Sequence, residues 1–182
     1  MARLIANSPT EGLLPLTIGQ AALTDATPKR ITTIAAYPGQ AAALGKALAT
    51  AGLGWPAPNR SVMAEKGGLF WSGRDQAFLT DLAPPAGLDR HAALTEASDG
   101  WIALSLSGPD MVAVLARLVP LDLSLAAFPV GATARSALQH MSVLFVRPAE
   151  EVMQIYLFRS MTAFAVHEIA QAMTSVAARR AL

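Results

Sequence analysis

The sequence predicts an α+β fold of two similar lobes, each with a β-α-β-β pattern and mainly antiparallel sheet. Three observations lead to this prediction: strand-like alternation of side chains, short helices that follow proline-containing turns, and the recurrence of this combination along the chain. We expect residues 1–182 to form a single domain, because a chain of this length buries about 70% of its unfolded surface. The lobes are placed at about 13–85 and 86–182, divided at the Pro- and Gly-rich stretch 84–87.

The elements of the first lobe are predicted from turn residues and alternating side chains. Pro15 keeps the first strand short and at the sheet edge, because proline has no backbone hydrogen to donate. Gly52 ends the first helix, and two prolines in 55–58 exclude helix from the following connection. We expect an edge strand at 13–18, a strand at 31–36, a helix at 41–51, and a hairpin of 68–72 with 76–81.

The second lobe is centred on residues 98–120, where a turn, a buried strand and a helix follow one another. Asp99-Gly100 is typical of a two-residue hairpin turn, which predicts that a strand at 92–97 pairs with the strand that begins at Trp101. This strand, 101–106, alternates between two faces.

A short helix follows that strand. Gly108 is expected to be its N-cap, Pro109 its first residue, and Asp110 a complement to its positive end. Pro120 ends the helix. The remaining expected elements are a loop that contains Asp122 and Gly131, strands at 133–138, 141–147 and 152–158, and a final helix at 161–178 that Ser160 caps.

The strand, turn and helix of the second lobe repeat those of the first. Aligning Pro38 with Pro109, an offset of 71 residues, also aligns Leu44 with Leu115. Lys46 then falls on Arg117. This match indicates an internal duplication.

Composition restricts the classes of partner. A net charge of +1 offers no basic field for nucleic acid, and no stretch reaches the roughly 18 apolar residues of a membrane span. The start of the chain lacks the apolar core of a secretion signal and there is no cysteine, so we expect a cytoplasmic protein. With 53% hydrophobic and only 15% charged residues, the sequence favours a protein–protein surface over the alternative of a compact, alanine-rich monomer.

Local motifs of catalysis are not complete anywhere in the sequence. His167-Glu168 begins like a zinc-protease helix, but position 171, where the second histidine belongs, is Gln. Neither a G-x-S-x-G elbow nor a G-x-G-x-x-G fingerprint occurs. We therefore predict no catalytic residue, no cofactor-binding residue and no metal ligand in this chain.

Three basic residues, Arg135, His140 and Arg159, are candidates for polar interface contacts or for contacts to an anion. His140 lies near a strand bend, between Arg135 and Arg147; the alternative is a partly buried structural histidine. Arg159 lies at a strand end beside a helix start, a position suited to a carboxylate or phosphate, or to an acidic neighbour at a subunit contact.

A set of short segments is characteristic in its order and spacing. These segments are Ser98-Asp-Gly-Trp101, Leu106-Ser-Gly-Pro109, Val114-Leu-Ala-Arg-Leu118, Pro120-Leu-Asp-Leu123, Phe128-Pro-Val-Gly131, Arg135, His140-Met141 and Arg159-Ser160. Together they resemble the gamma subunit of heterotetrameric sarcosine oxidase. The resemblance is dense from about residue 93 to 168 and looser before it, where Pro58-Asn-Arg60 and the hairpin at 71–79 also contribute.

This resemblance implies a fold similar to the folate-binding domain of aminomethyltransferase, with two intertwined lobes. It also implies a complex with alpha, beta and delta subunits that oxidatively demethylates sarcosine to glycine and passes the one-carbon unit to tetrahydrofolate. In such complexes FAD, FMN and NAD belong to the larger subunits and zinc to the smallest, while the gamma subunit has no evident catalytic role.

Two functions therefore remain open from the sequence. The first is a non-catalytic gamma subunit that supports assembly with the flavin-bearing subunits. The second is a stand-alone folate-binding one-carbon-transfer protein of the same fold, in which Arg135, His140 or Arg159 would contact the folate. The sequence leaves open self-association of the isolated chain, and a related N-methyl amino acid as substrate.

Overall fold

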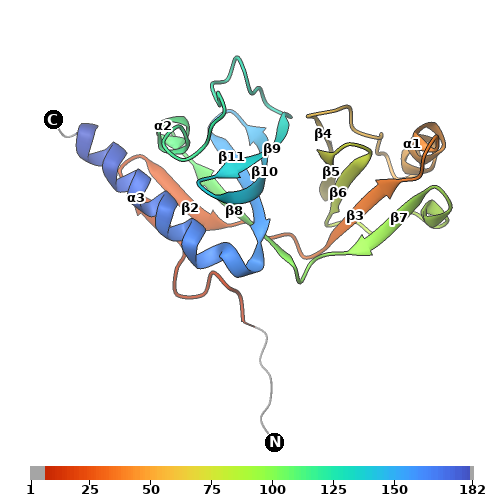
Figure 1. The fold of residues 1–182 in the computed structure, drawn as a ribbon, viewed down its shortest axis with the longest axis horizontal. Helices are drawn as coiled ribbons and strands as arrows, with labels where there is room; N and C mark the ends of the chain where they lie inside the picture. The colour runs from red at the N-terminus through yellow and green to blue at the C-terminus, as the bar shows by residue number, and fades with distance from the viewer. Residues whose placement is uncertain (1–6, 181–182) are drawn as a thin grey trace, which may run out of the picture.

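The computed structural model describes residues 7–180 and has four layers (Figure 1). Two antiparallel sheets face each other across an apolar core, and helices cover the outer face of each sheet. Side-chain alternation explains this arrangement: in β8 (Trp101–Ser107), Ile102 and Leu104 face the outer helices, whereas Ala103 faces the other sheet. The predicted α+β class with mainly antiparallel sheets is confirmed.

The six-stranded sheet combines strands from both ends of the described chain. Its order is β1-β2-β8-β11-β10-β9, with every neighbouring pair antiparallel. The helices α2 (Met111–Leu115) and α3 (Thr162–Arg180) cover its outer face. Its other strands are β1 (Leu16–Ile18), β2 (Ala21–Asp25), β9 (Thr133–Leu138), β10 (Met141–Ala149) and β11 (Val152–Phe158).

The five-stranded sheet is made from the middle of the chain, in the order β4-β5-β6-β3-β7. Helix α1 (Ala41–Ala49) packs on its outer face through Leu44 and Leu48, which are fully buried. The strands are β3 (Ile31–Ala36), β4 (Ser61–Ala64), β5 (Gly67–Gly73), β6 (Gln76–Thr80) and β7 (Ala92–Glu96), with a 3₁₀ turn at Leu88–Arg90 before β7.

One unit of a strand, a helix and three strands occurs twice with the same topology. β3, α1, β4, β5 and β6 give the strand order β3-β6-β5-β4, and β8, α2, β9, β10 and β11 give β8-β11-β10-β9. The strand before each unit pairs with the first strand of the other unit: β2 pairs with β8, and β7 with β3. The two lobes are therefore intertwined by an exchange of one strand each.

The exchanged strands have almost the same sequence, AALTD in β2 and AALTE in β7, at the offset of 71 residues from Ala21 to Ala92. Their pairings are similar, with registers that differ by one residue at this offset: Thr24 lies opposite Ser105 and Thr95 opposite Thr33, so each strand sets its threonine against a hydroxyl side chain. The structure thus supports the internal duplication that the prolines indicated, and adds β2, the counterpart of β7 that sequence analysis missed.

The predicted hairpin at Asp99-Gly100 is wrong. β7 and β8 lie in different sheets, so the turn between them crosses from one sheet to the other. Trp101 explains the crossing, since its side chain is buried between the sheets with its ring centroid 4.9 Å from that of Phe78. A strand with apolar side chains on both faces gains more by entering the centre of the larger sheet than by reversing onto β7.

The division between the sheets also differs from the predicted lobe boundary at residues 85 and 86. β7 follows that boundary yet belongs to the five-stranded sheet, while β1 and β2 precede it and belong to the six-stranded sheet. The strand exchange is the reason, because it places one strand of each half in the sheet of the other half.

Helix α2 begins at Met111, two residues later than predicted, and Gly108 is not its N-cap. Gly108 instead has φ +107° and lies against the backbone of Gln20. Asp110 occupies the cap position without a side-chain capping bond. Its carboxylate, only 2% exposed, forms an ion pair of 2.5 Å with the Arg180 guanidinium at the end of α3.

The other predicted elements are confirmed, with no end more than three residues from its predicted position. The edge position of β1 is confirmed, and so is the hairpin of β5 and β6. The predicted helix cap at Ser160 is wrong, because this residue lies inside a 3₁₀ turn, Arg159–Met161, that precedes α3. Within residues 7–180, no helix combines the length and apolar character that a bilayer crossing requires.

Burial of Tyr156 between the sheets makes the fold sensitive to alkali. Loss of hydration, with the nearby charge of Asp81 as a second cause, raises the pKa of Tyr156 far above its usual range. The unfolded chain releases this proton above about pH 10 whereas the folded chain retains it, so stability falls as the pH rises beyond that value.

We therefore expect a Tyr37→Phe variant, in which Tyr156 is the one remaining tyrosine, to show tyrosinate absorbance only as tertiary structure is lost. An alkaline titration followed by absorbance and near-UV circular dichroism tests this. A reversible titration near pH 10 with the fold intact would contradict it.

Candidate functional site

Arg135, the first candidate, connects the two sheets. It lies on β9, and its Nε donates a hydrogen bond of 2.6 Å to the carbonyl oxygen of Ser72 in β5. Its guanidinium also lies 5.5 Å from the ring centroid of Trp101, a cation–π distance. Partial burial lowers the pKa of Arg135. The donor group of Arg135 is thus directed at the junction between the sheets.

His140 lies in the turn between β9 and β10, after Gln139, which has φ +53°. The imidazole is exposed and lines an open apolar groove of about 420 Å³. The walls of this groove come from β10, β11, the 3₁₀ turn before α3 and the first turn of α3: Met141, Ser142, Phe158, Met161 and Phe164.

Arg159 follows β11 directly and is half-buried. Its backbone N–H donates to the carbonyl oxygen of Gly100 at 2.9 Å, and its Nη2 donates to the carbonyl oxygen of Asn7 at 2.6 Å. Arg159 therefore holds both the crossing turn before β8 and the segment that leads into β1.

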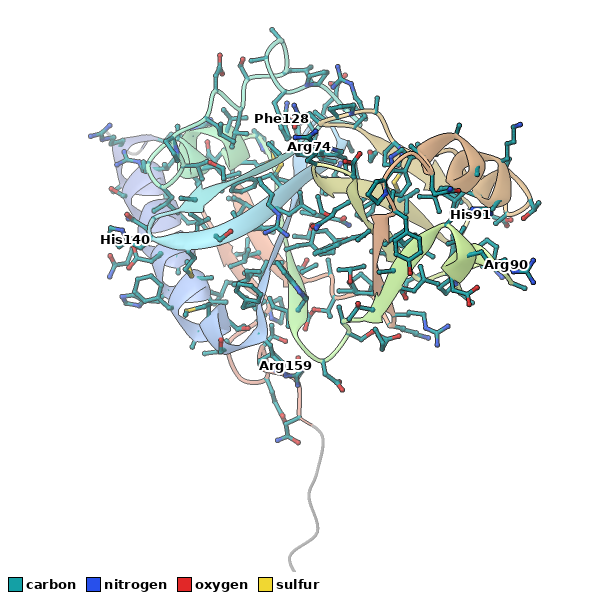
Figure 2. All side chains as sticks on the ribbon, turned by 45° about the vertical axis from the view of Figure 1, so that its right-hand side comes forward. Arg74, Arg90, His91, Phe128, His140 and Arg159 are labelled. Carbon is teal, nitrogen blue, oxygen red and sulfur yellow. The ribbon has the colours of Figure 1, made fainter. Side chains whose placement is uncertain are left out.

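The three candidates do not converge on one point. His140 and Arg159 are well separated in Figure 2, and the guanidinium of Arg135 is directed at Ser72 and Trp101. A folate carboxylate or a phosphate requires donors that meet at one position. The structure therefore does not assemble Arg135, His140 and Arg159 into a single anion site.

The motif residues of the second lobe have identifiable positions in the fold. Asp99 and Gly100 are exposed in the crossing turn, and Pro109 is exposed before α2. Asp122 accepts a hydrogen bond of 2.9 Å from the backbone N–H of Ser124; this bond, with a further one from the Ser124 side chain, lowers the pKa of the carboxyl group.

Gly131 joins the two sheets through its backbone. With φ +82°, it donates its N–H to the carbonyl oxygen of Arg147 and accepts from the N–H and hydroxyl of Ser61, at 2.8, 2.8 and 3.0 Å. The bridge between Arg60 and Ala132 continues this junction.

Arg147, which sequence analysis did not select, is the most unusual polar residue of the described chain. It is fully buried, yet no ion pair to it is found among residues 7–180. Its Nη1 donates to the carbonyl oxygen of Phe128 at 2.7 Å and its Nη2 to that of Leu123 at 2.8 Å. Its Nε has no hydrogen-bond partner in the part of the chain that the structure describes. Desolvation lowers the pKa of Arg147, against the opposing effect of Glu150.

A signal for this residue was present in the sequence. Arg147 follows Phe145 by two positions in a strand, so alternation places both on the same face, and Phe145 lies in the main core. The sequence prediction treats Arg147 only as a neighbour of His140 at a strand end, because arginine is rarely buried without a partner charge.

His91 and His167 each contact a glutamine side chain. Nδ1 of His91 lies 3.0 Å from Oε1 of Gln40, and Nε2 of Gln171 lies 2.7 Å from Nε2 of His167. Across the described residues, no group of three or more His, Asp or Glu side chains is placed to hold a metal ion.

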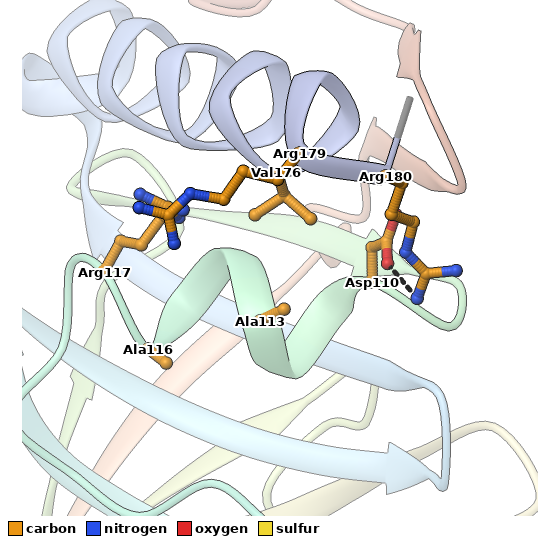
Figure 3. Close-up of a pocket in the computed structure, with 7 residues that line it drawn as sticks. All are labelled: Asp110, Ala113, Ala116, Arg117, Val176, Arg179 and Arg180. Atoms are coloured by element: carbon orange, nitrogen blue, oxygen red, sulfur yellow. Dashed lines mark ion pairs between the residues drawn. The ribbon is translucent and has the colours of Figure 1, made fainter. Parts of the chain in front are cut away.

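The other cavities are open depressions at the surface. One of about 480 Å³ lies between α2 and α3, where Arg117 and Arg179 approach each other and Arg180 is paired with Asp110 (Figure 3). Another, of about 590 Å³, is lined in part by Lys29 and Asp81, whose carboxylate accepts the backbone N–H of Lys29.

The fold and the dispersed candidates define an internally duplicated, strand-exchanged α+β protein in which Arg135, Arg147 and Arg159 bind backbone carbonyls. The chain is similar to one in the solved structure of heterotetrameric sarcosine oxidase from Corynebacterium sp. U-96 in complex with pyrrole 2-carboxylate. The two chains share 25% sequence identity and superpose with a TM-score of 0.79, covering 94% of this chain and 96% of the other. The resemblance to a subunit of heterotetrameric sarcosine oxidase is thus confirmed by this comparison.

Other solved structures are much less similar. Aspartate kinase from Clostridium acetobutylicum superposes with a TM-score of 0.41 at 11% identity, covering 86% of this chain and 34% of that chain. The regulatory subunit of aspartate kinase from Thermus thermophilus gives 0.39 at 16% identity, with 86% and 99% covered. These scores are too low to support an argument. No protein-family model matches the sequence, and no curated protein matches it either.

Proposed function

We propose that this chain is the gamma-type subunit of a heterotetrameric sarcosine oxidase and that its role is assembly. The observation that carries the proposal is the match over almost the full length of both chains, at a TM-score of 0.79. A match of this extent shows similarity over nearly the whole length of both chains, and not in one motif alone. The segments of the sequence that resemble gamma subunits identify which subunit we propose.

In this proposal the partner subunits, and not this chain, carry out the oxidation and the one-carbon transfer. The alpha, beta and delta chains would hold FAD, FMN, NAD and zinc, and tetrahydrofolate would accept the one-carbon unit there. Two observations support an assembly role for this chain: Arg135, Arg147 and Arg159 all donate to backbone carbonyls, and several large apolar side chains are exposed. The complex would work in the cytoplasm.

Co-expression with the other three subunits tests this proposal. We expect an affinity tag on this chain to recover all three partners in equal amounts, with sarcosine-dependent peroxide formation in the purified complex. Omitting this chain should reduce the yield of assembled complex. An unrelated protein with the same tag is the control, and recovery of this chain alone would contradict the proposal.

Calorimetry with tetrahydrofolate distinguishes the stand-alone folate-binding alternative. For the isolated chain we expect no heat of binding, because Arg135, His140 and Arg159 do not meet at one position. Micromolar binding that an Arg135→Met or Arg159→Met variant abolishes would favour the alternative.

A further inference from the structure

The loop between α2 and β9, residues 116–132, projects beyond the body of the protein. It rises above both sheets at the top of Figure 1. Loops longer than about 12–15 residues without secondary structure are uncommon in compact domains, and ordered examples are usually functional. Two of the segments that carry the family resemblance, 120–123 and 128–131, lie within it.

The outer surface of this loop is apolar. Leu125 is 44% exposed and Val130 is 50% exposed, and Ala126 and Ala127 are exposed between them. We call these four residues the apolar tip. Between residues 123 and 131 the loop has no charged side chain, whereas a solvated surface normally carries about 25–35% charged residues.

The loop is nevertheless held in one conformation. Leu123 and Phe128, 2% and 7% exposed, anchor it in the core, with Phe128 at its base in Figure 2. Within it, the N–H of Phe128 donates to the carbonyl oxygen of Ser124 at 2.8 Å. Arg147 then binds the carbonyl oxygens of both anchor residues from beneath.

This use of Arg147 is costly, since no ion pair to its buried guanidinium is found among residues 7–180 and the nearby charge of Glu150 offsets the desolvation only in part. In return, the two hydrogen bonds fix a loop that presents aliphatic side chains to solvent. A rigid loop loses little conformational entropy when it binds, which is the property that favours a permanent protein interface.

We propose that the apolar tip inserts into an uncharged, apolar cleft on another subunit of the complex, with Arg147 as the residue that positions it. This inference depends on the proposed function and names the surface that would carry it out. The choice of a different chain as partner follows from the similar structure, which is heterotetrameric. The face of β4 beside the loop extends the surface, because Ser61 binds Gly131 and Met63, 55% exposed, lies on the same side of that strand.

A double variant, Leu125→Glu and Val130→Glu, tests the proposal in the co-expressed complex. Because both side chains are exposed, we expect the isolated variant to keep the circular dichroism and melting temperature of the wild-type chain. Its association with the partner subunits should weaken at least about tenfold, since carboxylates would enter an apolar cleft. Tyr37→Glu is the matched control: Tyr37 is also 44% exposed but follows β3, next to α1, and this variant should assemble normally.

The outcomes separate this inference from the function on which it depends. A double variant that assembles as well as wild type overturns the inference and leaves the proposed function intact. A wild-type chain that recovers no partner overturns both. A wild-type chain that forms dimers which the double variant abolishes, while the complex still assembles, overturns the inference in favour of a second copy as the occupant.

Discussion

Gly108→Ala is expected to destabilise the folded chain by about 3 kcal/mol or more and to lower its melting temperature by about 6–12 °C. A Cβ at this position would lie 2.2 Å from the carbonyl oxygen of Gln20, and φ is +107°. The Gln20 carbonyl belongs to the backbone, so it cannot move away as a flexible side chain would. Relief of the clash would have to shift the start of β2 away from the end of β8, where the strand exchange takes place.

Gly12→Ala is the matched control for this variant. Gly12 also has a positive φ, +75°, but a Cβ added there would have no atom of residues 7–180 within 4 Å. The free energy of unfolding of the Gly12→Ala variant should fall by only about 1 kcal/mol, because only the strain of the backbone conformation is added. Urea unfolding of both variants measures the difference, and equal losses would show that the contact with Gln20 does not constrain the fold.

Arg147→Met is expected to lower the free energy of unfolding by about 2–4 kcal/mol. Methionine fills a similar length of the core, but it leaves the carbonyl oxygens of Leu123 and Phe128 buried without a donor. The removal of a buried charge recovers part of this cost. We expect the loop to become mobile, so that thermolysin cleaves the variant near Leu125 faster than it cleaves the wild-type chain.

Arg135→Met provides the comparison, because its guanidinium gives one hydrogen bond to a carbonyl from a more exposed position. The free energy of unfolding of Arg135→Met should fall by about 1 kcal/mol, and thermolysin should cleave the loop at the wild-type rate. Arg147→Lys keeps the charge without the two-pronged geometry and should fall between wild type and Arg147→Met. If Arg147→Met were cleaved at the wild-type rate, Arg147 would not position the loop.

Most elements could be predicted from the sequence because their signals are local. Alternation and turn residues located β3, α1, the β5–β6 hairpin, the strands from β8 to β11 and α3. β2 was missed since Ala21–Asp25 is a short alanine-rich stretch without the branched or aromatic residues typical of strands. The strand exchange could not be predicted either, because the pairing of β2 with β8 joins residues about 80 positions apart. The local Asp99-Gly100 turn signal instead favoured pairing of β8 with β7.

Residue types predicted the candidate site less well. Arg135, His140 and Arg159 were selected for their charge and for their places near strand ends, but only the packing of the sheets determines where their side chains are directed. Arg147 was overlooked for the opposite reason: its importance arises from complete burial against a loop that lies about 20 residues earlier in the chain.

The exchange of β2 and β7 between the two lobes has a consequence for the synthesis of the chain. While the ribosome is still translating the middle of the chain, β2 has no partner on its β8 side, because β8 does not yet exist. The nascent polypeptide therefore carries an open strand edge until more than half of it has been made, and an edge of this kind is prone to pair with other chains. Because each sheet contains one strand from the other half of the chain, neither half can complete its sheet alone, and we expect stable folding only after synthesis of the whole polypeptide.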